Sequence, residues 1–293
     1  LFKYLAKANI PIVWTLHDCW SFTGHCTHFE SNGCYKWKTE CGDCPLLMLQ
    51  YKSRLIDRTT RNFRIKKKLY SHVDKLTIVP VSNWLGALLK DSILSRHKIM
   101  VIRNGVDLEL FKPVESKIRE QLGISRGRKM ILGVVDAGFK GKKEFIMLAK
   151  YTNYQIVLVG VKNAWKKDLP HNIICIPRTN SQKELAEYYS AADVFVNPTQ
   201  DDTFPTTNIE AIACGTPVVT YNAGGSPEIL DKNTGIVVER NDINALHLAI
   251  ESILKNGKGM YLEACRNRAV QNFDKNIRFQ NYIELYSELI GMP

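Results

Sequence analysis

The sequence predicts an α/β fold made of two domains, each a parallel sheet covered by helices, and three observations support this. Short, continuous apolar runs alternate with helical stretches along the whole chain, as is typical of strands buried on both faces of a parallel sheet. The pattern restarts after a turn at residues 103–107. The chain has 293 residues, of which 45% are hydrophobic, and single cores stop growing near about 250 residues.

The first predicted domain, residues 1–107, is an incomplete Rossmann-like domain. Its expected elements are a helix at 1–8, a strand at 10–16, a loop rich in Cys and Trp, a basic helix at 49–72, a strand at 75–80, a helix at 83–94 and a strand at 99–102. The sequence begins at Leu1 rather than Met, already inside a predicted helix. We therefore expect residues upstream of it.

The second predicted domain, residues 108–276, is a complete doubly wound domain. Its expected strands lie at 130–135, 156–161, 173–176, 194–197 and 218–220. Ser181 and Glu184 form a capping box that starts one of the intervening helices. Another helix starts near Pro205 and ends at Gly215. Residues 277–293 are predicted to be a C-terminal amphipathic helix that packs back across the domains.

Composition narrows the classes of function. Neither a signal peptide nor a run of about 18 apolar residues occurs, so we expect a cytoplasmic protein, with contact to the inner face of the membrane left open. The formal net charge of +11 favours phosphate-bearing partners. Nucleic acid is not expected as a partner, because no recognised nucleic-acid-binding motif occurs.

The segment after the strand at 194–197 carries the richest candidate site. Ligands of open α/β sheets bind beyond the carboxyl ends of the strands, where helix N-termini offer N–H groups to anions. Asp202 lies on the loop there, and Pro205 starts the helix. Glu210 lies about one and a half turns into that helix, where it could accept hydrogen bonds from a sugar diol. The plain alternative is that Asp202 caps the helix and Glu210 is a solvated carboxylate.

This segment resembles the donor-site motif of glycosyltransferase family 4, the glycosyl transferases group 1, of the type that builds bacterial surface polysaccharides. Asp202 and Glu210 are separated by seven residues and followed by the turn Gly215-Thr-Pro217, as in that family. The resemblance implies that Glu210 binds the nucleotide ribose and that Asp202 contacts the transferred sugar. The family's first acid is usually Glu, and Asp202 is about one methylene shorter.

Two more segments resemble donor-site loops of the family. Lys140 matches its phosphate-binding lysine, although Val135 stands where many members have an arginine. In the second segment, two adjacent glycines follow the strand at 218–220. For both segments, the simpler interpretation is an ordinary turn without a ligand. The donor-binding residues implied by the resemblance are Lys140, Gly141, Arg178, Phe204, Pro205, Thr206, Thr207, Glu210, Gly224 and Gly225.

The resemblance covers nearly all of the chain and implies a GT-B fold. The implied activity is retaining transfer of a hexose from a nucleoside-diphosphate sugar to a glycan or lipid-linked acceptor, with no cofactor required for catalysis. The implied catalytic residues are Asp202, Glu210 and His17, the last at a strand end where a structural histidine is the plain alternative. A sugar-nucleotide epimerase, a phosphorylase and a noncatalytic nucleotide-sugar-binding or scaffold protein remain alternatives.

Four cysteines cluster in the first domain. Cys26, Cys34, Cys41 and Cys44 fall within nineteen residues and include a Cys-x-x-Cys pair. Four thiolates at such spacing suit a structural zinc ion that would staple an irregular loop. The alternatives are buried free thiols or a redox pair.

A basic segment, residues 52–68, contains eight Lys or Arg residues and one acid, Asp57. Arg54, Arg58 and Arg61 would share one face of a helix. Such a face is usually solvated. With a lipid-linked acceptor it could instead contact the membrane surface or a pyrophosphate.

Overall fold

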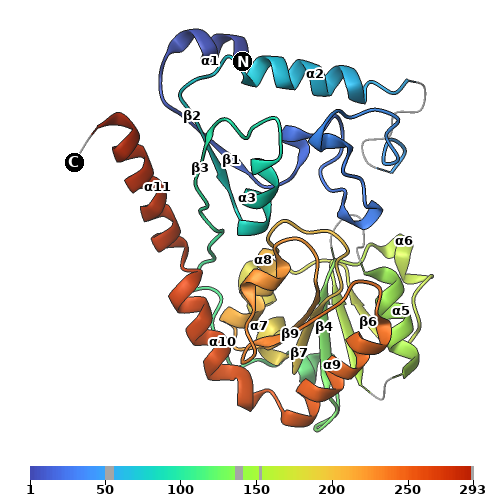
Figure 1. Cartoon of the computed structure of the whole chain (residues 1–293). Helices are drawn as coiled ribbons and strands as arrows, with labels where there is room; N and C mark the ends of the chain where they lie inside the picture. The colour runs from blue at the N-terminus through green and yellow to red at the C-terminus, as the bar shows by residue number, and fades with distance from the viewer. Residues whose placement is uncertain (50–55, 136–140, 152–153, 292–293) are drawn as a thin grey trace. The chain divides into compact units, whose positions relative to one another are not determined.

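The computed structural model of the chain describes residues 1–49, 56–135, 141–151 and 154–291 (Figure 1). The chain divides into two compact units. The first comprises Leu1–Asn104, Asp201–Phe204 and Arg278–Pro293, and the second comprises Gly105–Gln200 and Pro205–Ile277. Both sheets are parallel, so the predicted α/β fold class is confirmed.

The first unit is built on a three-stranded sheet in the order β1-β2-β3. Ile12 lies opposite Leu76 and Ile78 opposite Ile99. The elements of this unit are α1 (Phe2–Ala8), β1 (Ile12–Leu16), α2 (Thr59–Tyr70), β2 (Leu76–Pro80), α3 (Asn83–Lys90) and β3 (Lys98–Ile99). Every residue of β2 is buried, as the continuous apolar run predicted.

The basic helix expected at 49–72 is shorter than predicted. Residues 56–58 are not helical, and α2 begins at Thr59, so Arg58 precedes the helix; Arg54 lies outside the described residues. The physical reason is Asp57, whose carboxylate accepts hydrogen bonds from the backbone N–H of Thr59 at 2.7 Å and of Cys44 at 2.9 Å. These bonds hold the chain in a turn before the helix starts.

The second unit contains a six-stranded sheet in the order β6-β5-β4-β7-β8-β9. Figure 1 shows its strands side by side with helices around them. The elements are α4 (Ile118–Gln121), β4 (Met130–Val134), α5 (Lys142–Tyr151), β5 (Gln155–Val159), α6 (Asn163–Lys166), β6 (Ile173–Ile176), α7 (Gln182–Ala191), β7 (Val194–Asn197), α8 (Thr206–Ala213), β8 (Val218–Tyr221), β9 (Gly235–Val238), α9 (Ile243–Asn256) and α10 (Gly259–Asn272). The five predicted strands are all present, and β9 was not predicted.

Helices cover both faces of this sheet. α5 and α9 contact each other and α9 packs on β7, β8 and β9, while α7, α8 and α10 group together against β4, β7 and β8. The capping box of α7 is confirmed in part, because the Ser181 hydroxyl accepts from the Glu184 N–H at 3.1 Å. The Glu184 carboxylate accepts from the N–H of Asn180 at 2.6 Å, one residue earlier than in the standard box.

The last helix, α11 (Lys275–Ile290), begins two residues before the predicted 277. From Arg278 onward it belongs to the first unit, where Leu285 packs against Val79 and Ile102. The hydroxyl groups of Tyr282 and Thr15 are 3.1 Å apart. Among the described helices, none combines the length and the apolar character needed to cross a bilayer.

Candidate functional site

The order of strands in the second unit places a switch point between β4 and β7. The chain runs outward from β4 through β5 to β6, then returns to β7 and continues through β8 to β9 on the other side. In open parallel sheets, ligands bind outside the carboxyl ends of the strands at such a point. The loops after β4 and β7 are therefore the expected walls of a binding site.

Gly141, directly before α5, lies close to Pro198, directly after β7. Gly141 has φ +80°, and a Cβ atom placed on it would lie 2.6 Å from Cγ of Pro198, so only glycine fits without a shift. Next to this contact, the Gln200 side-chain amide donates to the Glu144 carboxylate at 3.0 Å. Lys140, the predicted phosphate ligand, lies outside the described residues.

Helix α8 opens at the same edge of the sheet. Pro205 is its N-cap and provides no side-chain hydrogen bond, and its first turn carries no acidic residue. The N–H groups of the first turn of a helix have no partner within the helix, so this end favours an anion. The Asn197 amide donates to the Asn208 side-chain oxygen at 2.8 Å, which ties α8 to the end of β7. Thr206 is exposed, and Thr207 is half-buried.

Glu210 is held by a buried tyrosine. The Tyr189 hydroxyl, on α7, donates to Glu210 Oε2 at 2.9 Å, and Tyr189 is 0% exposed. Burial raises the pKa of Glu210 above its usual value, and the bond from Tyr189 opposes this rise. Burial, followed by the neighbouring Glu210 charge, raises the pKa of Tyr189 well above its ordinary value. The tyrosine therefore remains protonated and acts only as a donor.

The two predicted glycines follow β8. Gly224 has φ +56°, and Gly225 leads into a short 3-10 helix, η4 (Ser226–Ile229). Arg268 on α10 donates to the carbonyls of Glu228, Ile229 and Leu230. These bonds from α10 therefore hold the segment after Gly225 in place. Arg178 is exposed after β6, an edge strand separated from β4 by β5, so it is the predicted donor residue farthest along the sheet from the switch point.

The remaining predicted catalytic residues belong to the first unit. His17 is exposed directly after β1. Asp202 Oδ1 accepts from the N–H of Phe204 at 3.2 Å, which is the local turn bond expected of an Asp before a helix. Phe204 is 3% exposed.

The four clustered cysteines lie in one apolar cluster of the first unit together with Phe22, Phe29 and Trp37. All eight cysteines of the chain are free thiols. Burial raises the pKa of Cys26 to about 12, and the neighbouring thiols of Cys44, Cys41 and Cys34 contribute. Within the described residues, no three His, Cys, Asp or Glu side chains are placed so as to hold a metal ion. The zinc site stays a prediction.

Sequence reasoning missed three residues that support the site. Tyr189 precedes Glu210 by 21 residues, and no pattern signals their hydrogen bond. Arg266 on α10 donates to the carbonyls of Phe111 at 2.7 Å and Ala213 at 3.1 Å, and Arg268 holds the segment after Gly225. Both arginines come from a helix without a predicted role.

Comparison with known proteins places these features in a family. The family model of glycosyl transferases group 1 matches residues 114–272, more than half of the chain. The chain is 26% identical over 300 aligned residues to WcaC of Escherichia coli, named as a colanic acid biosynthesis glycosyl transferase, and the match covers 97% of this chain and 70% of WcaC. It is 24% identical over 235 residues to an uncharacterized protein in the cps region of Klebsiella pneumoniae, covering 75% of this chain and 65% of that protein.

Among solved structures, HepE of Anabaena in complex with UDP matches with a TM-score of 0.70 and 18% identity, over 98% of this chain and 77% of HepE. Sucrose-phosphate synthase from Thermosynechococcus elongatus matches with a TM-score of 0.68 and 24% identity, over 78% of this chain and 62% of that one. These likenesses support the GT-B fold. With the family match over the segment that carries Glu210 and the Gly215-Thr-Pro217 turn, they lead to one conclusion: the chain belongs to the glycosyl transferases group 1 family.

Proposed function

We propose that this chain is a retaining glycosyltransferase that moves a hexose from a nucleoside-diphosphate sugar to a glycan or lipid-linked glycan in cell-surface polysaccharide biosynthesis. The observation that carries the proposal is the position of Glu210, held by Tyr189 on a helix whose N-terminus opens beside the switch point. The names of the relatives support the pathway, since WcaC is named for colanic acid biosynthesis. Solved structures of HepE hold UDP or UDP-glucose.

In the proposed reaction, the bond between the anomeric carbon and the diphosphate breaks, and the acceptor hydroxyl attacks the anomeric carbon from the same face. The proton of that hydroxyl passes to an oxygen of the leaving diphosphate. The N–H groups at the start of α8 and the ammonium of Lys140 stabilise the charge that develops on the leaving diphosphate. Glu210 holds the ribose and Asp202 contacts the hexose. Catalysis in this scheme depends on positioning and electrostatic stabilisation, without an enzyme nucleophile or a required cofactor.

The proposed acceptor and location follow from charge. The net charge of +11 favours an anionic surface or a pyrophosphate-bearing acceptor, at the cytoplasmic face of a membrane. Within the basic segment 52–68, Lys66 is buried and Arg64 pairs with Glu40. The exposed cations that remain for such a contact include Arg61, Lys67 and Lys68.

Thermal unfolding in the presence of UDP-, GDP- and ADP-sugars tests the donor site. A ligand at 100 times its Kd stabilises the folded state by about 2.7 kcal/mol, so one of the three series should raise the melting temperature at millimolar concentration. Absence of any shift in the intact protein contradicts the proposal. Transfer or hydrolysis of a labelled donor then separates an enzyme from a noncatalytic nucleotide-sugar-binding protein.

A further inference from the structure

The turn at Gly215-Thr-Pro217 is connected to Glu210 through a chain of two hydrogen bonds. The Thr216 hydroxyl donates to the backbone carbonyl of Tyr189 at 2.6 Å, and the Tyr189 hydroxyl donates to Glu210 at 2.9 Å. Thr216 and Tyr189 are both 0% exposed. The two bonds therefore join the end of the motif to its second acid through the interior of the unit.

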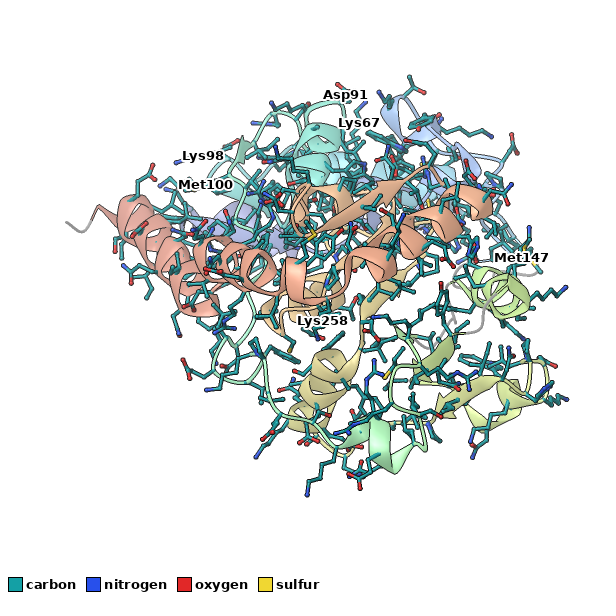
Figure 2. The ribbon with its side chains drawn as sticks, turned by 90° about the horizontal axis from the view of Figure 1, so that it is seen from below. Lys67, Asp91, Lys98, Met100, Met147 and Lys258 are labelled. Atoms are coloured by element: carbon teal, nitrogen blue, oxygen red, sulfur yellow. The ribbon has the colours of Figure 1, made fainter. Side chains whose placement is uncertain are left out.

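Packing fixes the tyrosine on every side. Its ring contacts Phe195 edge-on at a centroid distance of 5.3 Å and Phe111 at 6.2 Å. The Lys258 ammonium, labelled in Figure 2, donates to the carbonyl of Ser190 at 2.6 Å and that of Tyr189 at 3.4 Å. A side chain held at both its backbone and its ring has little rotamer freedom left, so its hydroxyl is aimed before any ligand arrives.

The geometry points to Tyr189 as the positioning residue for Glu210: its hydroxyl occupies one carboxylate oxygen and so presents the other to the ribose of the donor nucleotide, with Thr216 locking the tyrosine. Within the described residues, Oε1 of Glu210 makes no hydrogen bond. This inference rests on the proposed function, because it assigns Glu210 to a nucleotide. It adds a structural reason for a Gly-Thr-Pro turn to follow the acidic pair.

Other titratable groups surround α8. They are Cys214 at the end of α8, Lys258 at the N-cap of α10, Arg266 on α10, and Glu228 on η4. Burial raises the pKa of Glu210, and the bond from Tyr189 lowers it. Removing that bond should therefore raise the pKa of Glu210 further, which a purely structural role of the tyrosine would not predict.

The test compares Tyr189→Phe with the matched control Tyr188→Phe, a buried tyrosine next to it on the same helix. Carbon-13 NMR of labelled glutamate, assigned with Glu210→Gln, measures the Glu210 pKa in the folded protein. Calorimetry measures the Kd of UDP, GDP and ADP, and of the 2′-deoxy form of the tightest of them.

We expect Tyr189→Phe to raise the Glu210 pKa and to weaken binding of the nucleoside diphosphate about 10-fold. It should also reduce the difference in Kd between the ribose and 2′-deoxyribose forms. Thr216→Val should shift the same three quantities in the same direction by less, and Tyr188→Phe should shift none of them. If Glu210→Gln weakens binding, but Tyr189→Phe leaves the Glu210 pKa or the Kd of the diphosphate unchanged, the role of Tyr189 is overturned and the proposed function stands. If the wild-type protein binds none of the three diphosphates, or Glu210→Gln binds as tightly, the proposed function falls with it.

Discussion

Gly141 lies against Pro198, with no room for a side-chain atom between the two residues. This contact lies beside the switch point between β4 and β7. Substituting Gly141→Ala should push residues 141 and 198 apart, because the new Cβ would approach Cγ of Pro198 to 2.6 Å. We expect donor affinity to fall at least about 10-fold and the free energy of unfolding to fall by about 1–3 kcal/mol.

Gly257→Ala is the matched control for this effect. Gly257 has φ +81°, nearly the same as the +80° of Gly141, but a Cβ atom there would meet nothing within 4 Å. The control should share the backbone strain and keep donor affinity. Equal affinities in the two variants, measured by calorimetry, would show that the contact does not shape the site.

The pH dependence of activity should report Glu210. Burial raises its pKa, so the carboxylate becomes protonated at a higher pH than an ordinary glutamate, whose pKa is about 4.3. A protonated Glu210 loses acceptor capacity for the ribose, so kcat/KM should fall as the pH is lowered through that raised pKa. The profile of Glu210→Gln should lack this limb and lie about 100-fold lower at neutral pH. A wild-type profile that stays flat down to pH 4.5 contradicts the assignment.

Lys66 should stabilise the first unit rather than bind a ligand. Its ammonium donates to the carbonyls of Trp20 at 2.5 Å and Thr23 at 2.9 Å, and burial lowers its pKa to about 8. Lys66→Met leaves both carbonyls without this donor, so we expect a loss of about 2–4 kcal/mol in unfolding free energy. The exposed neighbour Lys68→Met should change it by less than about 0.5 kcal/mol in the same urea titrations. Similar losses in both variants would argue against a structural role for Lys66.

The zinc hypothesis is tested by metal analysis of protein purified without chelators. One zinc ion per chain is expected if Cys26, Cys34, Cys41 and Cys44 are ligands, and removing it should lower the melting temperature by at least about 5 °C. Cys44→Ser should lose the metal, whereas Cys175→Ser, outside the cluster, should retain it. Metal-free protein with an unchanged melting temperature after chelation would support buried free thiols instead. Glycosyl transfer itself should survive magnesium removal.

The sequence predicted most of the second unit because burial on both faces of a parallel sheet leaves continuous apolar runs. The strand β6, for instance, has the predicted bounds, Ile173–Ile176. The strand β9 was missed, because Gly235–Val238 begins with a glycine and follows a turn-rich segment. Its existence depends on pairing with β8, where Val218 lies opposite Gly235, and such pairing leaves no local signal.

The candidate site divides in the same way. Motif spacing identified Glu210, the start of α8 and the two glycines after β8, since each is a local feature of a strand end. Tyr189 could not be found from the sequence, because its role depends on how α7 packs beside α8. The arginines of α10 donate to backbone carbonyls, which every residue has, so their partners leave no sequence signal. The late start of the predicted basic helix, after Asp57, likewise depends on a distant partner, the N–H of Cys44.

The decisive measurement is a crystal structure of the full chain with a bound nucleoside diphosphate. We expect the ribose hydroxyls to contact Glu210 while Tyr189 keeps its bond to Oε2, and the diphosphate to contact the N–H groups of Thr206 and Thr207. A nucleotide seated elsewhere, with Glu210 and the start of α8 facing only solvent, would contradict this expectation.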